Sequence, residues 1–322
     1  MATAAKPLKI VFAGTPEIAQ VVLAQLVTTE HNIVAVLTKP DSPQGRGQKL
    51  TPSLVKQFAQ QQQLTVYQPQ SLKQDATIIE ILKQLQPDIM VVVAYGLILP
   101  ANVLSIPRLG CINIHVSLLP RFRGAAPINR AILAGDTISG VTLIQMDSGL
   151  DTGDILMQQQ VLITSHDTAQ SLHDKLASLG AKMLLEYLAN YAKIQPQPQS
   201  QDGVCYAPKI DKSEALINWQ EDATIIERKI RGFNPAPGCY SFLEQKLIKF
   251  WQAAIGPKTS CEQVGQILQV TREHLIVCCG NSSSLVVQQL QESGKPKQLA
   301  ANYILGHKTL CGKCFSNTAI SN

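Results

Sequence analysis

Short apolar runs alternate with longer amphipathic stretches along the first 190 residues. The runs have the length and continuity of strands that are covered on both faces. The stretches between them carry apolar residues at helical spacing. Strands alternating with helices predict an α/β fold, a Rossmann-like, mostly parallel sheet with helices on both faces. The predicted strands are 8–13, 33–37, 64–67, 88–94, 111–116 and 141–146, and the predicted helices are 17–27, 52–60, 72–85, 127–134 and 168–191.

The pattern changes after residue 194. A Pro/Gln-rich stretch over 194–203 is typical of a linker. A helix and five short, turn-bounded strands then favour a small OB-like β-barrel. The helix is predicted at 224–231 and the strands at 239–242, 247–251, 265–270, 275–278 and 285–289. We therefore expect an α/β domain over 1–194, a linker over 195–208 and a β-barrel domain over 209–322, with a frayed tail from Cys311.

Composition narrows the class of protein. The chain has 322 residues and is 45% hydrophobic, so it can bury a core without disulfides. No apolar run reaches about 18 residues, which excludes a transmembrane helix. The first residues lack a signal-peptide pattern. We expect a cytoplasmic protein whose eight cysteines are reduced.

The positive charge gathers in the last third of the chain. The net charge is +5, and residues 209–322 hold 13 Lys and Arg against 9 Asp and Glu. This imbalance hints at a polyanionic partner. A solvated basic surface is the simpler interpretation of charge alone.

The segment 110–127 is the most informative for chemistry. Asn113 and His115 alternate with apolar residues, so they share one face of a predicted strand. An Asn amide can donate to a developing oxyanion, and a His can take or relay a proton. A carboxylate to hold the imidazole is then expected nearby. The loop 146–154 offers three, Asp147, Asp151 and Asp154, at a spacing that does not fit an EF-hand, so we expect no metal.

Two other loops carry turn-forming residues. The turn Gly14-Thr15-Pro16 lacks the glycines of a dinucleotide-binding loop, which disfavours a nicotinamide dehydrogenase. The loop 39–52 is rich in Pro, Gly and cations, as functional loops often are, although a surface insertion is equally consistent. Cys311 and Cys314 stand alone, without a second pair at zinc spacing.

Together these segments resemble a known superfamily. The motifs AGTP, KPDSPQGRGQKLTP, AYGLILP, GCINIHVSLLPRFRGAAPINRAI, MDSGLDTGDIL and RGFNPAPG occur in this order. They are similar to the folate-dependent formyltransferases, and within them to the family that formylates methionyl-tRNA. The resemblance implies a formyltransferase catalytic domain followed by an OB-like tRNA-binding domain. It implies transfer of a formyl group from 10-formyltetrahydrofolate, a co-substrate, to the α-amino group of methionyl-initiator tRNA.

The resemblance also implies site residues. It places Asn113, His115 and Asp151 in catalysis, and it assigns folate binding to Ser117, Leu118, Leu119 and Pro120. From the neighbouring strand end we add Ala94, Tyr95 and Gly96 to the folate pocket. The residues expected to contact tRNA are Arg46, Lys49, Lys209, Lys212, Arg228, Lys229 and Arg231. We expect a monomer that contacts no membrane.

Alternative functions remain at this point. A formyltransferase for another amine, or a formyltetrahydrofolate hydrolase, would keep the catalytic residues without needing Arg46 or a basic barrel. A non-catalytic RNA-binding protein would need no intact catalytic set.

Overall fold

The computed structural model describes residues 6–44, 47–307 and 309–318. The chain divides into two compact units. Unit 1 comprises 1–127, 138–162 and 173–207, and unit 2 comprises 128–137, 163–172 and 208–322. Both units are therefore discontinuous in sequence, and each is described by itself.

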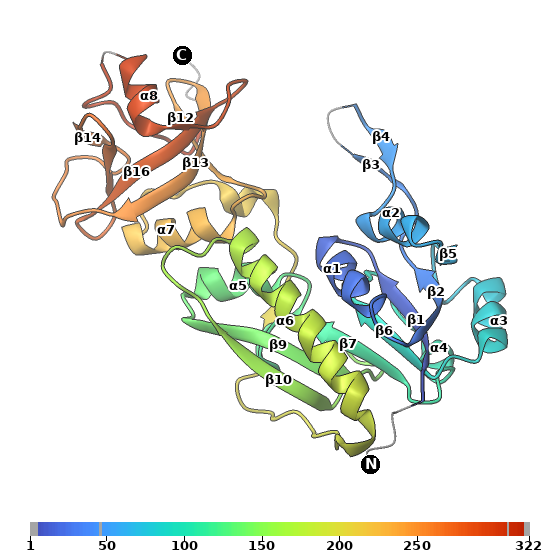
Figure 1. The fold of residues 1–322 in the computed structure, drawn as a ribbon. Helices are drawn as coiled ribbons and strands as arrows, with labels where there is room; N and C mark the ends of the chain where they lie inside the picture. Colours follow the sequence, from blue (N-terminus) through green and yellow to red (C-terminus); the bar gives the residue numbers. More distant parts are fainter. Residues whose placement is uncertain (1–5, 45–46, 308, 319–322) are drawn as a thin grey trace. The chain divides into compact units, whose positions relative to one another are not determined.

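Unit 1 is built on a seven-stranded sheet with the order β10-β9-β7-β6-β1-β2-β5 (Figure 1). The strands are β1 (Lys9–Gly14), β2 (Asn32–Leu37), β5 (Val66–Tyr67), β6 (Ile89–Val93), β7 (Cys111–His115), β9 (Ile138–Gln145) and β10 (Ile155–Leu162). The first five of these pair in parallel, whereas β9 runs antiparallel to β7 and to β10. This confirms the predicted mostly parallel sheet.

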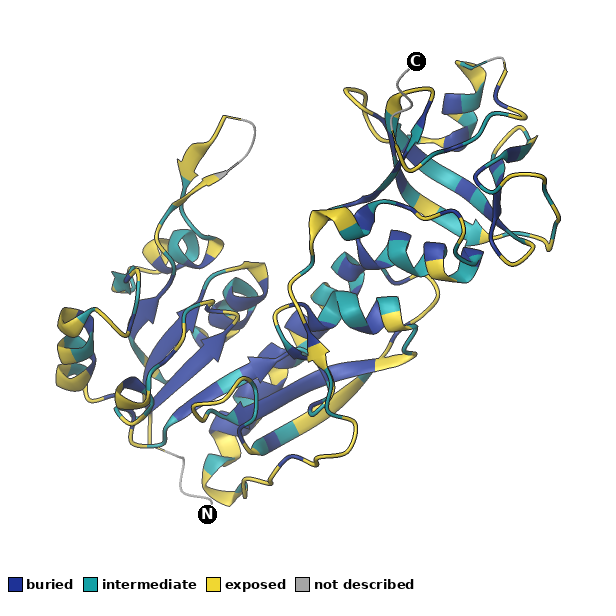
Figure 2. Cartoon of the chain, turned by 180° about the vertical axis from the view of Figure 1, so that it is seen from behind, coloured by how far each residue is buried: buried dark blue, intermediate teal, exposed yellow. Residues whose placement is uncertain are grey.

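Helices cover both faces of this sheet. Val11 and Ala13 of β1 pack with Ile78 of α3 (Ala76–Leu85) on one face. On the other face, Gly14 meets α1 (Glu17–Leu26), and Gly180 of α6 (Ala169–Asn190) meets Ile114. The remaining helices outside unit 2 are α2 (Leu54–Gln61), α4 (Ala101–Leu104) and the 3-10 helix η1 (Tyr191–Lys193). The layering explains why the central strands are almost fully buried (Figure 2).

Three features of unit 1 differ from the prediction. Helix α3 begins after its N-cap Asp75, whose side chain accepts from the Ile78 amide, and not near residue 72. Strand β10 was not predicted, because an edge strand with exposed glutamines lacks a continuous apolar run. A small hairpin of β3 (Ser42–Gln44) and β4 (Lys49–Thr51) lies in the loop 39–52.

The segment predicted as a linker is held against unit 1. Gln197 forms a bridge with Ile155, and β11 (Tyr206–Ala207) pairs in parallel with β8 (Arg123–Gly124). Gln199, between them, is buried. These contacts differ from those of a free connector, which a Pro/Gln-rich composition alone would indicate.

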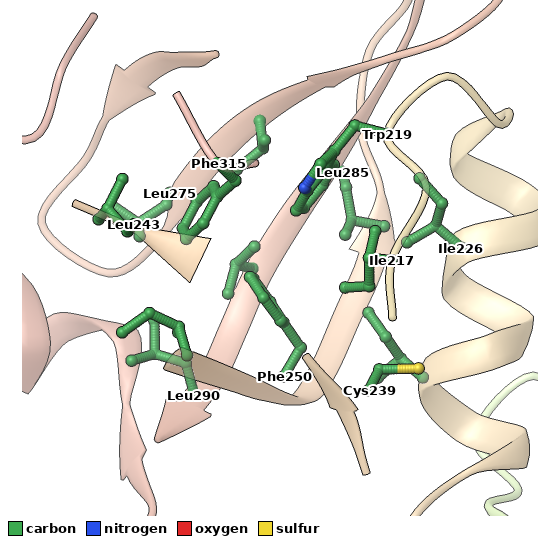
Figure 3. Packing of buried hydrophobic residues seen from close by; sticks show 14 of the residues in the cluster. Ile217, Trp219, Ile226, Cys239, Leu243, Phe250, Leu275, Leu285, Leu290 and Phe315 are labelled. Atoms are coloured by element: carbon green, nitrogen blue, oxygen red, sulfur yellow. The ribbon is translucent and has the colours of Figure 1, made fainter. Parts of the chain in front are cut away.

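Unit 2 contains an antiparallel sheet with the order β12-β13-β16-β15-β14 and with β17 beside β16. The strands are β12 (Cys239–Leu243), β13 (Lys246–Ile255), β14 (Ile267–Val270), β15 (Leu275–Cys279), β16 (Ser283–Glu292) and β17 (Gln298–Leu299). The helices are α5 (Pro127–Ala134), α7 (Ala223–Gly232), α8 (Ala300–Leu305) and the 3-10 helix η2 (Lys212–Ala215). Trp219, Phe250 and Phe315 pack together in its core (Figure 3).

The C-terminal segment closes this sheet. Ser316 bridges Phe242 on one edge strand, and Cys314 bridges Gln266 beside the other. Phe315 between them is 3% exposed. The expectation of a frayed tail from Cys311 is therefore wrong for residues up to 318, because one aromatic side chain anchors the segment in the core.

A disulfide joins Cys261 to Cys278 on β15. The expectation that all eight cysteines are reduced is thus wrong for this pair, because the loop before β14 brings the two Cα atoms to 6.4 Å. Within the described ranges, no helix combines the length and the apolar character that crossing a membrane requires.

Candidate active site

Strand β7 presents two polar side chains on one face. Asn113 and His115 project from the carboxyl end of the strand into a cavity of about 410 Å³. Ile112 and Ile114 are buried on the opposite face. The alternation predicted from sequence is therefore the reason that the amide and the imidazole share one site.

Asp151 joins these two side chains. Its Oδ1 accepts from Asn113 Nδ2 at 3.2 Å, and its Oδ2 lies 3.6 Å from His115 Nδ1. The Gly124 amide also donates to Oδ2, at 2.8 Å. The other candidates do not face His115 in this way: Asp147 accepts from Gly149 and Thr152 within its own loop, and Asp154 is exposed.

Backbone contacts determine the tautomer of His115. Its Nε2 lies 2.9 Å from the Phe122 carbonyl oxygen. A carbonyl can only accept, so the hydrogen of the neutral ring resides on Nε2. Nδ1 then carries the lone pair, and it has no hydrogen-bond partner among the described residues. Nδ1 is therefore the ring nitrogen with a free lone pair, and it faces the Asp151 carboxylate.

The wall of the cavity comes from the residues that follow β6. Ala94, Tyr95 and Gly96 line it. Ala94 and Gly96 both have positive φ, so the backbone turns sharply here. Tyr95 is 2% exposed, and burial raises its pKa. In the part of the chain that the structure describes, its hydroxyl is the one buried side-chain polar atom without a hydrogen-bond partner.

The predicted folate residues 117–120 are not among those lining this cavity. The Ser117 hydroxyl donates to the Arg121 carbonyl, and the Leu119 amide donates to Thr142. Leu118 packs where a side chain on Gly140 would lie. These contacts shape the turn that leads from β7 to Phe122 and Gly124, which in turn hold His115 and Asp151.

The predicted tRNA residues have different surroundings. Lys49, Lys209 and Lys212 are exposed, and Arg46 lies outside the described residues. Lys229 pairs with Glu221 at 2.6 Å. Arg231 donates to Glu227 and to the Asp167 carbonyl, and Arg228 lies over Gly135. Lys229 and Arg231 are thus already neutralised within unit 2, whereas the three exposed lysines have no acidic partner among the described residues.

No group of three or more His, Cys, Asp or Glu side chains with the geometry to hold a metal ion occurs in the described ranges. Two residues near the site were missed by the sequence analysis. Gln199 donates to the Asp151 carbonyl, and Arg123 donates to Gln199. Their position in a polar, Pro-rich stretch and in a turn gave no local signal.

Two parts of the chain match models of known protein families. Residues 8–188 match the formyl transferase family, and residues 209–308 match the formyl transferase C-terminal domain. An N-formyltransferase from Helicobacter canadensis, solved with folinic acid and dTDP-3-aminofucose, shares the fold with a TM-score of 0.67 at 21% identity. That match covers 88% of this chain and 99% of the other. Fold and family matches together define a formyltransferase with an appended C-terminal domain.

The relatives narrow this class. A methionyl-tRNA formyltransferase from Nitrosomonas eutropha is 48% identical over 313 residues, covering 97% of this chain and 98% of that protein. One from Nitrosomonas europaea is 44% identical over 320 residues, covering 98% of each. The chain belongs to the methionyl-tRNA formyltransferase family, which confirms the family expected from its motifs.

Proposed function

We propose that this chain transfers the formyl group of 10-formyltetrahydrofolate to the α-amino group of methionyl-initiator tRNA, with Asn113, His115 and Asp151 as its catalytic residues. The observation that carries the proposal is the convergence of these three side chains on one cavity. Membership of the methionyl-tRNA formyltransferase family supports the donor and the acceptor.

The chemistry begins with an amine that must lose a proton. Its nitrogen attacks the formyl carbon, and the carbonyl becomes a tetrahedral oxyanion. Collapse of this intermediate breaks the bond to the N10 atom of the folate, and N10 takes up the proton that the amine has lost. His115 Nδ1 is the group we assign to receive the amine proton, because Nε2 is committed to the Phe122 carbonyl.

Asn113 stabilises the oxyanion in this proposal. One hydrogen of its amide is given to Asp151, and the second is available to an oxygen in the cavity. Asp151 accepts from Asn113 and faces His115, so one carboxylate orients both groups. The arrangement supplies proton transfer and charge stabilisation at a single carbon.

Folate is proposed to occupy the cavity beside Ala94, Tyr95 and Gly96. Tyr95 belongs to this wall, while its hydroxyl is buried among core residues and is not offered to the ligand. The residues Ser117, Leu118, Leu119 and Pro120 are proposed on the family motif to bind folate. Their contacts also shape the turn that carries Phe122 and Gly124 to the site.

Recognition of tRNA is proposed to rest on phosphate contacts. Lys49, Lys209 and Lys212 are exposed and suited to this role. Arg46 is proposed on the family motif to approach the acceptor end. Arg228, Lys229 and Arg231 are also proposed to contact tRNA phosphates. The ion pairs of Lys229 and Arg231 leave these two side chains less free to do so. We further propose a catalytic domain over 1–194, a linker over 195–208 and a tRNA-binding domain over 209–322, in a cytoplasmic monomer that contacts no membrane.

A formylation assay tests the function. Purified protein is given 10-formyltetrahydrofolate with methionine-charged initiator or elongator tRNA, and formylmethionine is measured. Transfer to the initiator alone supports donor, acceptor and partner together. Absence of transfer to both tRNAs, with transfer to a small amine, would move the function to another acceptor.

A further inference from the structure

Gln199 is a buried side chain whose amide is fully committed. Its Nε2 donates to the Asp151 carbonyl and to the Gly153 carbonyl, both at 2.8 Å. Its Oε1 accepts from Arg123 Nη2 at 2.6 Å and from Arg123 Nε at 3.2 Å. Guanidinium nitrogens can only donate and backbone carbonyls can only accept, so the amide can adopt only this orientation.

Arg123 is an unusual partner for a glutamine. Its side chain is 6% exposed, and it has no carboxylate partner among the described residues. A buried guanidinium normally has an acidic partner. Here an amide oxygen takes that place, which polarises the amide and strengthens its two donated hydrogen bonds.

These hydrogen bonds end on a strained residue. Asp151 has a φ of +53°, in the left-handed region that side chains other than glycine rarely adopt. Such a conformation persists only where its surroundings enforce it. Gln199 holds the Asp151 backbone, and the amide of Gly124, directly after Arg123, holds the Asp151 carboxylate.

The arrangement therefore fixes Asp151 at two points. Arg123 anchors Gln199 on one side and precedes the Gly124 amide on the other, within strand β8, which pairs with β11. We infer that Gln199, anchored by Arg123, is a positioning residue that sets the Asp151 carboxylate against His115. This inference rests on the proposed function, because it gives the 195–208 segment a role in the same reaction.

The test uses Gln199→Glu in the full-length protein. The glutamate keeps the acceptor for Arg123 and turns that contact into an ion pair, so the anchor survives. It removes both donors to the Asp151 and Gly153 carbonyls. We expect kcat for formylation to fall about 100-fold, as for a catalytic group displaced by about 1 Å. We expect KM for folate and for tRNA to stay within about twofold, because substrate contacts are unchanged.

Gln201→Glu is the matched control. It makes the same charge change two residues away at an exposed position, and we expect wild-type kcat. Arg123→Lys keeps the charge but loses the fork, and it gives a second route should Gln199→Glu fail to fold. A smaller fall of kcat at constant KM is expected for it.

A double-mutant cycle separates positioning from general damage. In an Asp151→Asn background, Gln199→Glu should lower kcat by no more than about twofold, because its effect passes through Asp151. An equal 100-fold loss in both backgrounds would overturn the inference. So would full activity of Gln199→Glu.

A readout without turnover distinguishes this inference from the proposed function. The Gly124 amide, which donates to Asp151, should exchange its hydrogen at least about tenfold faster in Gln199→Glu than in Gln201→Glu. Unchanged exchange would overturn the positioning role, whether or not the protein formylates tRNA. A wild-type protein that formylates neither tRNA would instead overturn the proposed function alone.

Discussion

At the scale of single residues, His115 shows how surroundings select one chemistry for a side chain. Its Nε2 donates a hydrogen bond to the Phe122 carbonyl, and its Nδ1 faces the Asp151 carboxylate. A ring held in this way can accept a proton at one defined atom. Neither contact is visible in a sequence window, because Phe122 reaches the ring through a turn with positive φ.

The first prediction concerns this ring. His115→Ala should lower kcat by about 10²- to 10⁴-fold, the range typical of a lost general base. Binding of folinic acid should survive, because the cavity wall from 94–96 remains. Single-turnover formylation measures the first effect, and calorimetry with folinic acid measures the second.

The control for this variant is His166→Ala, since His166 is an exposed histidine of unit 2. It should formylate at the wild-type rate. Turnover of His115→Ala at the rate of this control would exclude the ring from catalysis.

Residue patterns predicted part of the site. Period-two alternation brought Asn113 and His115 to one face, and this needed no tertiary information. Choosing among the three aspartates did require tertiary information. The left-handed turn at Asp151 and the hydrogen bond from the Gly124 amide place this carboxylate beside His115. Gln199 could not be predicted, because its partners are a carbonyl 48 residues away and Arg123 76 residues away.

At the scale of elements, the closure of the β-sheet in unit 2 depends on a short terminal segment. Ser316 exchanges backbone hydrogen bonds with Phe242, and Phe315 donates its amide to Gly265. The Phe315 ring stacks on Trp219 with centroids 5.4 Å apart (Figure 3). A polar tail is expected to fray, but burial of one ring is sufficient to order it.

The second prediction follows from that ring. Phe315→Ala should lower the free energy of unfolding of unit 2 by about 3–5 kcal/mol, as for other buried aromatic residues. Both tryptophans of the chain, Trp219 and Trp251, lie in unit 2, so tryptophan fluorescence during urea denaturation reports on it. Asn317→Ala, at an exposed neighbour, is the control. A Phe315→Ala midpoint equal to that of the control would refute the anchoring role.

The third prediction concerns the contact between α5 and η2. Arg130 donates to both carboxylate oxygens of Glu214, at 2.6 and 3.0 Å. This hydrogen bonding holds the pKa of Glu214 below its ordinary value of 4.5. A folded pKa below the unfolded one stabilises the fold above pH 4.5, and the contribution is lost as the pH falls through the folded pKa.

Glu214→Gln should therefore destabilise unit 2 at pH 7 by at most about 1 kcal/mol, because the pair is partly exposed to solvent. The difference from wild type should shrink at pH 4, where protonation weakens the native contact. Tryptophan fluorescence at both pH values measures it. Glu262→Gln, an exposed glutamate, should show no such dependence, and a difference that grows at pH 4 would contradict the assignment.

Elements were predictable where their patterns are local. The buried strands of the parallel sheet appear as apolar runs because both of their faces are covered. β10 and the 310–318 segment escaped prediction for the opposite reason. In each, polar residues interrupt the apolar ones, and the segment is held by pairing with another part of the chain.

At the scale of the whole molecule, the sequence predicted a division in two, whereas the division in space is interleaved. Residues 128–137 and 163–172 cluster with unit 2 although the chain around them builds unit 1. Hydrophobic periodicity is a local signal, so it cannot assign a helix to a unit formed by a later part of the chain. The net charge, by contrast, can be counted from the sequence alone. Which of the charged side chains are unpaired, and so available to a partner, is seen only in the structure.

The fourth prediction separates free from paired cations. Lys209 and Lys212 are exposed, and the contacts of the described residues give neither an acidic partner. If both contact tRNA phosphates, Lys209→Gln with Lys212→Gln should weaken binding at low salt and reduce the salt-dependence slope by about two, one for each contact. Anisotropy of labelled initiator tRNA across a KCl series measures the slope.

Lys229→Gln provides the comparison, because Glu221 already neutralises this lysine at 2.6 Å. The variant removes a positive charge from the molecule without removing a free one, so the slope should change by less than about half a unit. A general effect of net charge would instead scale with the number of lysines removed. Equal slopes for the wild type and the Lys209/Lys212 variant would show that these lysines are solvated surface, and tRNA binding would then depend on cations elsewhere in the chain, Lys49 first among them.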